Sequence, residues 1–567
     1  NNIPKIACFS TYCWNSNLSY QIASRIKKKY PNTIIVFGGP NYGIDAEEQE
    51  EFLKRHQSID VFIEGEGEEP FAQLLNVLFK YDFDIEKIKK ERIKVGSCHY
   101  IIDNEFIRGE LLSPISDLDN IPSPYLSGLL DKPLSQNFIP MIQTTRGCPF
   151  ACTFCQEGDD YYNKIRRFSL DRMKDELSYL AKKGTVSSLT ITDSNFGMYK
   201  EDLAFAREVA SIRDKYDWPK TFEGINGKNK KENILEAISI IGNTYFSAAV
   251  QSTDEQVLKN IKRKNISFTK MIDMVGEAKK SGTTGFSELI LGLPGDTKES
   301  HLKSNAQCLD AGVNRVRSHQ FAMLPASESA SKESRKKYGL ITRFRPVPMT
   351  VVSYSFLDED FFAPEIDEIC IGTNTLSVDD YVECRLFNLT VEIFYNGRIF
   401  EDLFKLIKKH DIKISEFIKG VHQRVRSSKN LSKVYDDFIR ETNELWETKE
   451  ELTEILQNDD ILDKFSSGEM GNNEQLVYSS IAVLDFQEEI HEIAFGFAAE
   501  ILNNNVNYNE STSGFIQEFE RYALATKRNM IHTENTISES FNYDFSSIIN
   551  SEFKKEPSGY YPSKKIR

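Results

Sequence analysis

The chain of 567 residues (65.1 kDa) has 40% hydrophobic and 11% aromatic residues, enough for roughly three or four domains with ordinary cores. Its formal net charge of -15 and pI near 5.3 disfavour broad binding to nucleic acid or to an anionic membrane. Its apolar runs are shorter than the ~20 residues that span a bilayer, and no signal peptide opens the sequence. We therefore expect a cytoplasmic protein whose nine cysteines are reduced.

The first 80 residues alternate apolar runs with amphipathic helical patterns, which predicts part of a doubly wound sheet. Residues 93–107 predict a hairpin beside it. Because only three strands precede the hairpin and the sequence begins Asn-Asn, we expect a domain over residues 1–110 whose beginning is incomplete. The expected strands are 5–9, 33–37 and 60–63, and the expected helices are 22–29 and 46–55.

A proline-rich linker over residues 111–137 leads to a second alternating region. Six strand-and-helix units follow each other there, which predicts a parallel sheet covered by helices over residues 138–345. Six units indicate an open or partial TIM barrel, (β/α)6. The expected strands are 139–145, 186–192, 221–226, 245–251, 285–292 and 315–321, and the expected helices are 169–183, 200–216, 231–241, 254–281 in two pieces, and 297–311.

Beyond about residue 345 the alternation stops, and residues 346–567 predict a mostly helical domain. No motif in this region indicates chemistry. The whole chain is therefore expected to be an α/β protein with three parts. They are a partial Rossmann-like domain, a partial barrel and a helical C-terminal region.

Three cysteines follow the first strand of the predicted barrel: Cys148, Cys152 and Cys155. The carboxyl ends of barrel strands are where α/β barrels place their chemistry. Neither a fourth cysteine nor a histidine lies close by in sequence, so a metal cluster held here would keep one iron without a protein ligand. The alternative is a zinc site that borrows a distant ligand, for which Cys98, Cys308, His301 and His319 are candidates. Zinc sites usually bring a second cysteine pair, and the sequence has none with that spacing.

With Phe154 included, the cysteine stretch resembles the hallmark of radical S-adenosylmethionine (radical SAM) enzymes, Cys-x3-Cys-x-aromatic-Cys. The resemblance implies a [4Fe-4S] cluster on the three cysteines and S-adenosyl-L-methionine (SAM) bound at the open iron. It also implies that a 5'-deoxyadenosyl radical is formed inside a barrel that excludes water.

Polar residues at the later strand ends are candidate SAM contacts. Asp193 lies where the family often has a Gly-Gly-Glu-like stretch, from which this sequence departs; the alternative for Asp193 is a loop or cap residue. For Arg263 the alternative is a solvated side chain within Lys262-Arg-Lys264. The other candidates are Glu223, Gln251, Ser252 and Glu288.

The upstream domain resembles the cobalamin-binding domain that precedes the barrel in one radical SAM class. Glycines at strand ends let a backbone approach a bulky ligand closely, although they also occur in tight turns without a ligand. The sequence has Asn41 where the family often has histidine, and it lacks the Asp-x-His-x-x-Gly signature. The candidate cobalamin contacts are Ser10, Thr11, Tyr12, Gly38, Gly39, Pro40, Gly65, Glu66 and Gly67.

The two resemblances together imply a cobalamin-dependent radical SAM methyltransferase that acts on an unactivated carbon of a small molecule or peptide. A reductant such as flavodoxin or ferredoxin is the expected partner, with no role for nucleic acid or a membrane. Two alternatives stay open: a radical SAM rearrangement or cyclisation enzyme that transfers no methyl group, and a zinc-stabilised binding module. The sequence does not identify the substrate or the role of residues 346–567.

Overall fold

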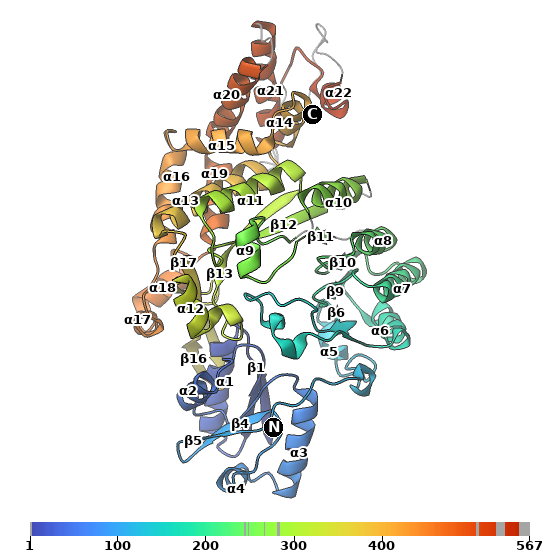
Figure 1. Cartoon of the computed structure of the whole chain (residues 1–567), viewed down its shortest axis with the longest axis vertical. Coiled ribbons are helices and arrows are strands. Elements are labelled where there is room, and N and C mark those ends of the chain that lie inside the picture. The colour runs from blue at the N-terminus through green and yellow to red at the C-terminus, as the bar shows by residue number, and fades with distance from the viewer. Residues whose placement is uncertain are drawn as a thin grey trace.

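The computed structural model describes residues 3–242, 245–247, 249–265, 267–280, 284–505, 510–528 and 539–554. Its N-terminal part is a five-stranded sheet in the order β1-β2-β3-β4-β5, at the lower, blue end of the molecule in Figure 1. The first three strands are parallel and the last two form an antiparallel hairpin. The elements are β1 (Ile6–Ser10), α1 (Ser16–Lys29), β2 (Ile34–Gly38), α2 (Ala46–Arg55), β3 (Val61–Ile63), α3 (Glu68–Lys80), α4 (Ile85–Lys90), β4 (Cys98–Ile102) and β5 (Glu105–Arg108).

Strand β2 explains why this sheet is covered on both faces. Its residues alternate between two hydrophobic clusters: Ile34 and Val36 pack on the side of α3 and α4, whereas Ile35 and Phe37 pack on the side of α1 and α2. A strand that is apolar on both faces must have helices on both. The three predicted parallel strands and the hairpin are confirmed, except that residues 93–95 form no strand.

The middle of the chain contains the six predicted strand-and-helix units (Figure 1, cyan to green). The strands pair in parallel within two groups, β10-β9-β6 and β11-β12-β13. Residues 248, 266 and 281 of the predicted elements lie outside the described residues. The units are β6 (Met141–Ile142), α6 (Leu170–Lys183), β9 (Ser188–Ile191), α7 (Lys200–Tyr216), β10 (Thr221–Glu223), α8 (Lys231–Ile241), β11 (Tyr245–Ser247), α9 (Glu255–Asn260), α10 (Phe268–Lys280), β12 (Thr284–Leu291), α11 (Lys298–Ala311) and β13 (Arg315–Ala322).

The first predicted strand of this region, 139–145, is longer than the strand in the structure, β6 (Met141–Ile142). Only β6 joins the parallel sheet, and the chain then turns into β7 (Thr145–Arg146), which pairs in antiparallel fashion with β8 (Arg166–Arg167). The β7–β8 pair closes the base of the loop that holds the three cysteines. The strand therefore ends early because the loop forms its own local pairing.

The prediction of a mostly helical region from residue 346 onward missed strands that begin just before it. Strand β17 (Ile366–Gly372) pairs with β13 and with β14 (Ile341–Pro346), and both pairs are antiparallel. Strands β15 (Ser353–Phe356) and β16 (Glu359–Phe362) form a separate hairpin. These strands break the strand-and-helix rhythm, so periodicity gave no signal for them.

Helices then form the upper end of the molecule, opposite the N-terminal sheet (Figure 1). They share one large hydrophobic cluster with the barrel helices, and Asn396 ties them to β13 because its side chain exchanges hydrogen bonds with the backbone of Val316 (2.9 and 2.8 Å). Among the described residues, no helix is long and apolar enough to cross a membrane. The helices of this upper part include α13 (Val378–Val391), α14 (Glu401–Lys409), α15 (Ile414–Val425), α16 (Leu431–Thr442), α19 (Glu474–Asp485), α20 (Gln487–Asn505), α21 (Glu510–Arg528) and α22 (Phe545–Asn550). Helices α12 (Lys332–Tyr338), α17 (Lys449–Ile455) and α18 (Asp459–Ser467) lie lower, near β16 and β17 (Figure 1).

Candidate functional site

The cysteine loop is fixed by backbone contacts at both of its sides. Gly147 has φ +97°, and the Cys148 N–H beside it donates to the Tyr162 carbonyl (2.8 Å). A side chain at position 147 would collide with the returning segment at Tyr162 and Lys164, so a glycine is required there. On the other side, the Thr153 N–H donates to the Ile261 carbonyl (3.2 Å), and its own carbonyl accepts from the Ser329 N–H (2.9 Å).

The three thiols lie at the inner side of this loop. Cys148 and Cys152 are 6% and 2% exposed, and Cys155 is partly buried. The Asn195 amide donates to Cys148 Sγ (3.2 Å), and the Lys228 ammonium lies 3.4 Å from Cys152 Sγ. Hydrogen bonds and positive charge directed at sulfur atoms are typical of the surroundings of cysteines that bind a metal.

A single metal ion does not fit this arrangement. Among the described residues, no group of three or more His, Cys, Asp or Glu side chains converges as ligands of one ion. A zinc site requires four ligands around one point at about 2.0–2.3 Å. In a cubane cluster each cysteine binds a different iron, so the thiols surround a larger body instead of converging. The chemistry of the donor set, three thiols from one loop, suits an iron-sulfur cluster.

Arg263 supplies a second cation beside the thiols. Its guanidinium is almost fully buried, and its Nε donates to Asn265 Oδ1 (2.8 Å) while another nitrogen donates to the Ala249 carbonyl. Burial lowers the pKa of Arg263, and the neighbouring Cys152 opposes that shift. This position excludes the alternative of a solvated arginine. A buried cation is stabilised by nearby electron-rich groups, which for Arg263 include the Cys152 sulfur and the Ala249 carbonyl.

A cavity of about 300 Å³ opens at the thiols and extends along the ends of β9 to β12. It brings together seven of the predicted site residues, which come from the cysteine loop, from β12, and from the segments that follow β9, β11 and α9. Its mostly apolar lining with a few polar side chains and its small size suit one cosubstrate molecule of moderate size. The predicted residues in the lining are Cys148, Phe154, Cys155, Asp193, Gln251, Arg263 and Glu288.

Asp193 holds the start of the cysteine loop. Its carboxylate accepts from the Thr144 N–H (2.7 Å), the Thr145 N–H (3.1 Å) and the Thr144 hydroxyl. Burial raises the pKa of Asp193, although these hydrogen bonds oppose the shift. The carboxylate therefore connects the end of β9 to the segment between β6 and β7.

Two amide side chains near the thiols keep an unsatisfied oxygen. Gln251 lines the cavity and Asn195 contacts Cys148; Gln251 Oε1 and Asn195 Oδ1 are buried and have no hydrogen-bond partner among the described residues. Gln251 also has φ +62°, a left-handed conformation that is strained for a residue with a side chain. Unpartnered buried acceptors and backbone strain at one cavity are typical of a ligand site.

Glu288 lies deeper in the cavity, on β12. Its carboxylate is 3.6 Å from His319 Nε2 on β13, and this partner lowers the pKa of Glu288. Two of the predicted SAM contacts do not line the cavity. Glu223 is exposed at the end of β10, and the Ser252 hydroxyl accepts from the Asp254 N–H (3.2 Å) in the turn before α9.

Sequence reasoning missed several lining residues. Lys228 and Asn226 follow β10 beyond a turn, and Asn195 and Asn265 lie in loops where the direction of a side chain depends on tertiary contacts. The sequence signal that could have indicated these residues is a polar residue two to five positions after a parallel strand. The missed lining residues with polar side chains include Glu157, Thr192, Ser194, Asn226, Lys228 and Asn265.

The loops after β1 and β2 contact each other closely. The Thr11 N–H and hydroxyl donate to the Gly38 carbonyl (2.8 and 3.2 Å), and a side chain at Gly39 (φ +115°) would meet the Thr11 backbone. Beside them Tyr12 and Trp14 stack at 4.6 Å with both rings exposed. An exposed aromatic pair at the carboxyl edge of a parallel sheet fits a large planar ligand. Ser10, Gly38 and Pro40 belong to the same edge.

The loop after β3 contacts the barrel. The Glu66 carboxylate forms a bidentate ion pair with Arg166 on β8 (2.6 and 2.9 Å) and also accepts from the Ile115 N–H (3.0 Å). The Glu66 N–H donates to the Tyr161 hydroxyl (3.0 Å), and this hydroxyl would block a side chain at Gly65. Glu66 and Gly65 therefore connect the N-terminal sheet to the cysteine loop, while Gly67 is open to solvent.

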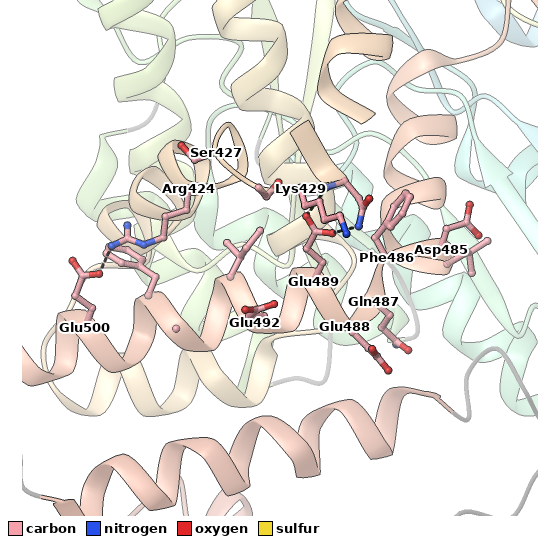
Figure 2. A pocket seen from close by; sticks show the side chains of 16 residues that line it. Arg424, Ser427, Lys429, Asp485, Phe486, Gln487, Glu488, Glu489, Glu492 and Glu500 are labelled. Atoms are coloured by element: carbon pink, nitrogen blue, oxygen red, sulfur yellow. Dashed lines mark hydrogen bonds and ion pairs between the residues drawn. The ribbon is translucent and has the colours of Figure 1, made fainter. Parts of the chain in front are cut away.

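Two larger clefts lie elsewhere. One of about 860 Å³ separates α1 and α2 from the segment around β17 and includes Cys13 and Asn41. The other, of about 870 Å³, lies between α15 and α20 (Figure 2). Figure 2 shows Glu500 paired with Arg424 in this cleft, and the Asn430 amide donates to Glu489 (2.8 Å). Among the described residues, no residue that lines either larger cleft has a buried side-chain atom without a hydrogen-bond partner.

Comparison with known proteins identifies the region around the cysteines. Residues 142–304 match the model of the Radical SAM superfamily. The chain is 27% identical over 461 residues to the 2-(S-pantetheinyl)-carbapenam-3-carboxylate methyltransferase of Streptantibioticus cattleyicolor, covering 77% of this chain and 65% of that protein. It is 28% identical over 434 residues to the cobalamin-dependent radical SAM methyltransferase TokK of Streptomyces tokunonensis, covering 74% and 61%. The chain thus spans less than two thirds of the length of both relatives.

Among solved structures, the cobalamin-dependent S-adenosylmethionine radical enzyme OxsB, with aqua-cobalamin and S-adenosylmethionine bound, is similar with a TM-score of 0.49 and 16% identity. The alignment covers 84% of this chain and 75% of that one.

Proposed function

Because residues 142–304 match the model of the Radical SAM superfamily, we propose that this protein is a cobalamin-dependent radical SAM methyltransferase that acts on an unactivated carbon of a small molecule or peptide. The observation that supports this most strongly is the set of three thiols, two of them buried, beside a strand-end cavity, with two cations next to them. Cys148, Cys152 and Cys155 would hold a [4Fe-4S] cluster. When bound, such a cluster supplies the electron that splits SAM into methionine and a 5'-deoxyadenosyl radical.

The protein's own residues bind and orient SAM. Gln251 offers a free buried carbonyl oxygen, Arg263 a buried cation and Glu288 a carboxylate, all facing one cavity. An ammonium or hydroxyl group of the cosubstrate can donate to the Gln251 oxygen and to the Glu288 carboxylate. The carboxylate of the cosubstrate can accept from the Arg263 guanidinium. Asp193 acts as a positioning residue for the cysteine loop. Phe154 packs against Ile261 and Phe321, which keeps water away from the thiols.

Cobalamin would bind at the carboxyl edge of the N-terminal sheet, where Tyr12 and Trp14 present exposed rings. When bound, it supplies the methyl group that the substrate receives. The surrounding contacts would come from the segments Ser10 to Tyr12 and Gly38 to Pro40. In this proposal Glu66 and Gly65 do not contact cobalamin. Their contacts with Arg166 and Tyr161 hold the N-terminal sheet beside the cysteine loop.

The proposed organisation follows from these sites. Residues 1–110 bind cobalamin, residues 111–137 connect, residues 138–345 form a partial (β/α)6 barrel, and residues 346–567 cover the substrate space. The relatives named as methyltransferases support a small-molecule substrate. A flavodoxin or ferredoxin would deliver the electron.

The test is anaerobic reconstitution with iron, sulfide and cobalamin, followed by incubation with SAM labelled in its methyl group. The proposal predicts 5'-deoxyadenosine release and, in candidate substrates, a mass increase of one labelled methyl group. Deoxyadenosine without methyl transfer to any substrate would indicate a rearrangement or cyclisation enzyme. A protein that binds one zinc per chain and releases no deoxyadenosine would be a binding module.

A further inference from the structure

Strands β12 and β13 have an inner face that continues from the SAM cavity. Their outward residues Leu289 and Val316 are buried in the large cluster with the helices, so the residues that alternate with them point to the opposite side. Glu288 on that side lines the cavity, and β13 pairs with β12 so that Arg317 lies opposite Glu288 and His319 opposite Ile290. Arg317 and His319 therefore share the face of Glu288.

Both side chains are exposed on this inner face. Arg317 lies over the ring of Phe286 (4.4 Å), which holds the guanidinium in a defined place. His319 is 55% exposed, and its Nε2 contacts Glu288 at 3.6 Å. Glu288 lies opposite Arg317 and is influenced by its charge, but within the part of the chain that the structure describes no carboxylate comes within ion-pair distance of Arg317. Arg315, two residues earlier, does form an ion pair, with Glu392 (2.7 Å).

We infer that Arg317 and His319 form a subsite for an oxyanion group of the substrate, a carboxylate or a phosphate. The subsite deepens the proposed function, on which it rests. The guanidinium is planar and presents several donors, so it can hold an oxyanion by two hydrogen bonds, and the imidazole adds a donor from the next inward position. In a chain of net charge -15, an exposed guanidinium that forms no close ion pair among the described residues is available for an external anion.

The position of the subsite also fits the chemistry. Glu288 belongs to both the SAM cavity and the His319 contact, so an anion bound at Arg317 would lie next to the cosubstrate. Holding the anionic end of a substrate at this point would orient the rest of it toward the thiols. The subsite would therefore select anionic substrates over neutral ones.

The test uses the reconstituted holoenzyme and an arginine-modifying reagent, phenylglyoxal, with peptide mass mapping of the modified positions. The probes are succinate and inorganic phosphate, with neutral succinamide and with sodium chloride at equal ionic strength as controls. We expect succinate or phosphate to slow the modification of Arg317 several-fold. The anion that protects Arg317 more strongly shows whether the subsite prefers a carboxylate or a phosphate. Arg207, an exposed surface residue paired with Glu236, should be modified at the same rate in all conditions.

The His319→Gln variant tests the second donor, and it should lose part of the protection at Arg317. Equal protection by succinamide, or no protection by either oxyanion, would overturn the subsite. Because protection is measured without turnover, its failure is separate from a failure of deoxyadenosine release, which would overturn the proposed function.

Discussion

The cysteine-loop cavity and the cleft between α15 and α20 differ in how they use their polar groups. In the cleft, Arg424 and Glu500 form an ion pair with each other at the surface, and no lining residue that the structure describes has a buried unsatisfied side-chain atom. At the cysteine loop, Lys228 and Asn195 point to thiols, and Gln251 keeps a buried oxygen without a partner. The smaller cavity is therefore the one that is incomplete by itself. Unsatisfied groups, more than volume, indicate where a ligand belongs.

The largest expected effect comes from removing one thiol. Cys155→Ala should abolish 5'-deoxyadenosine formation, because a cluster with two cysteine ligands does not stay bound in a site built for three. The measurement is deoxyadenosine by chromatography after anaerobic reconstitution. Cys8→Ala removes an exposed thiol on β1 and should retain activity. If both variants formed 5'-deoxyadenosine at the same rate, Cys155 would not be needed for SAM cleavage and the cysteine-loop cavity would not be the active site.

The contact between the N-terminal sheet and the cysteine loop gives the next largest effect. Glu66→Gln should lower the free energy of unfolding by about 3 kcal/mol, because it leaves the mostly buried Arg166 without its counter-ion. Urea denaturation measures the loss, and hydrogen exchange should increase in residues 156–168. Glu86 is exposed, so Glu86→Gln is the matched control and should change neither the free energy of unfolding nor hydrogen exchange in residues 156–168. An unchanged exchange rate in the loop would contradict the role of Glu66.

Lys228→Met tests the charge beside Cys152. It should lower the midpoint potential of the cluster on the order of 100 mV, since a unit charge about 7 Å away contributes roughly 2 kcal/mol at an effective dielectric constant near 20. Redox titration followed by electron paramagnetic resonance measures the potential. Lys228→Arg should keep it, and Lys230→Met removes an exposed charge two residues away as a control. If the midpoint potential were the same in all variants, the charge of Lys228 would have no influence on the cluster.

The smallest effect is expected in the cleft between α15 and α20. Glu500→Gln breaks a surface ion pair with Arg424 and should cost about 0.5 kcal/mol of stability, without an effect on deoxyadenosine release. A strong loss of SAM cleavage in this variant would show that the C-terminal cleft takes part in the chemistry.

Much of the fold could be predicted from periodicity. The six strand-and-helix units and the parallel strands before them repeat a regular pattern, and the structure places these elements within a few residues of the predicted ranges. Strands β14 to β17 were missed because short antiparallel strands with charged residues, such as Glu359 and Asp367, have no such period.

The site could be predicted where spacing along the chain decides the chemistry. The three cysteines are close in sequence, so their pattern was sufficient. Glu66 was assigned to cobalamin from its flanking glycines, but its partner Arg166 lies 100 residues away and only tertiary structure brings them together. Lys228 was missed for the same reason, because its contact with Cys152 spans 76 residues.

The most direct measurement of the central claim is electron paramagnetic resonance of the reduced, reconstituted protein with and without SAM. The account predicts about four irons per chain and a signal that changes when SAM binds, because one iron has no protein ligand. One zinc per chain with four protein ligands, or a cluster signal that SAM leaves unaltered, would contradict it.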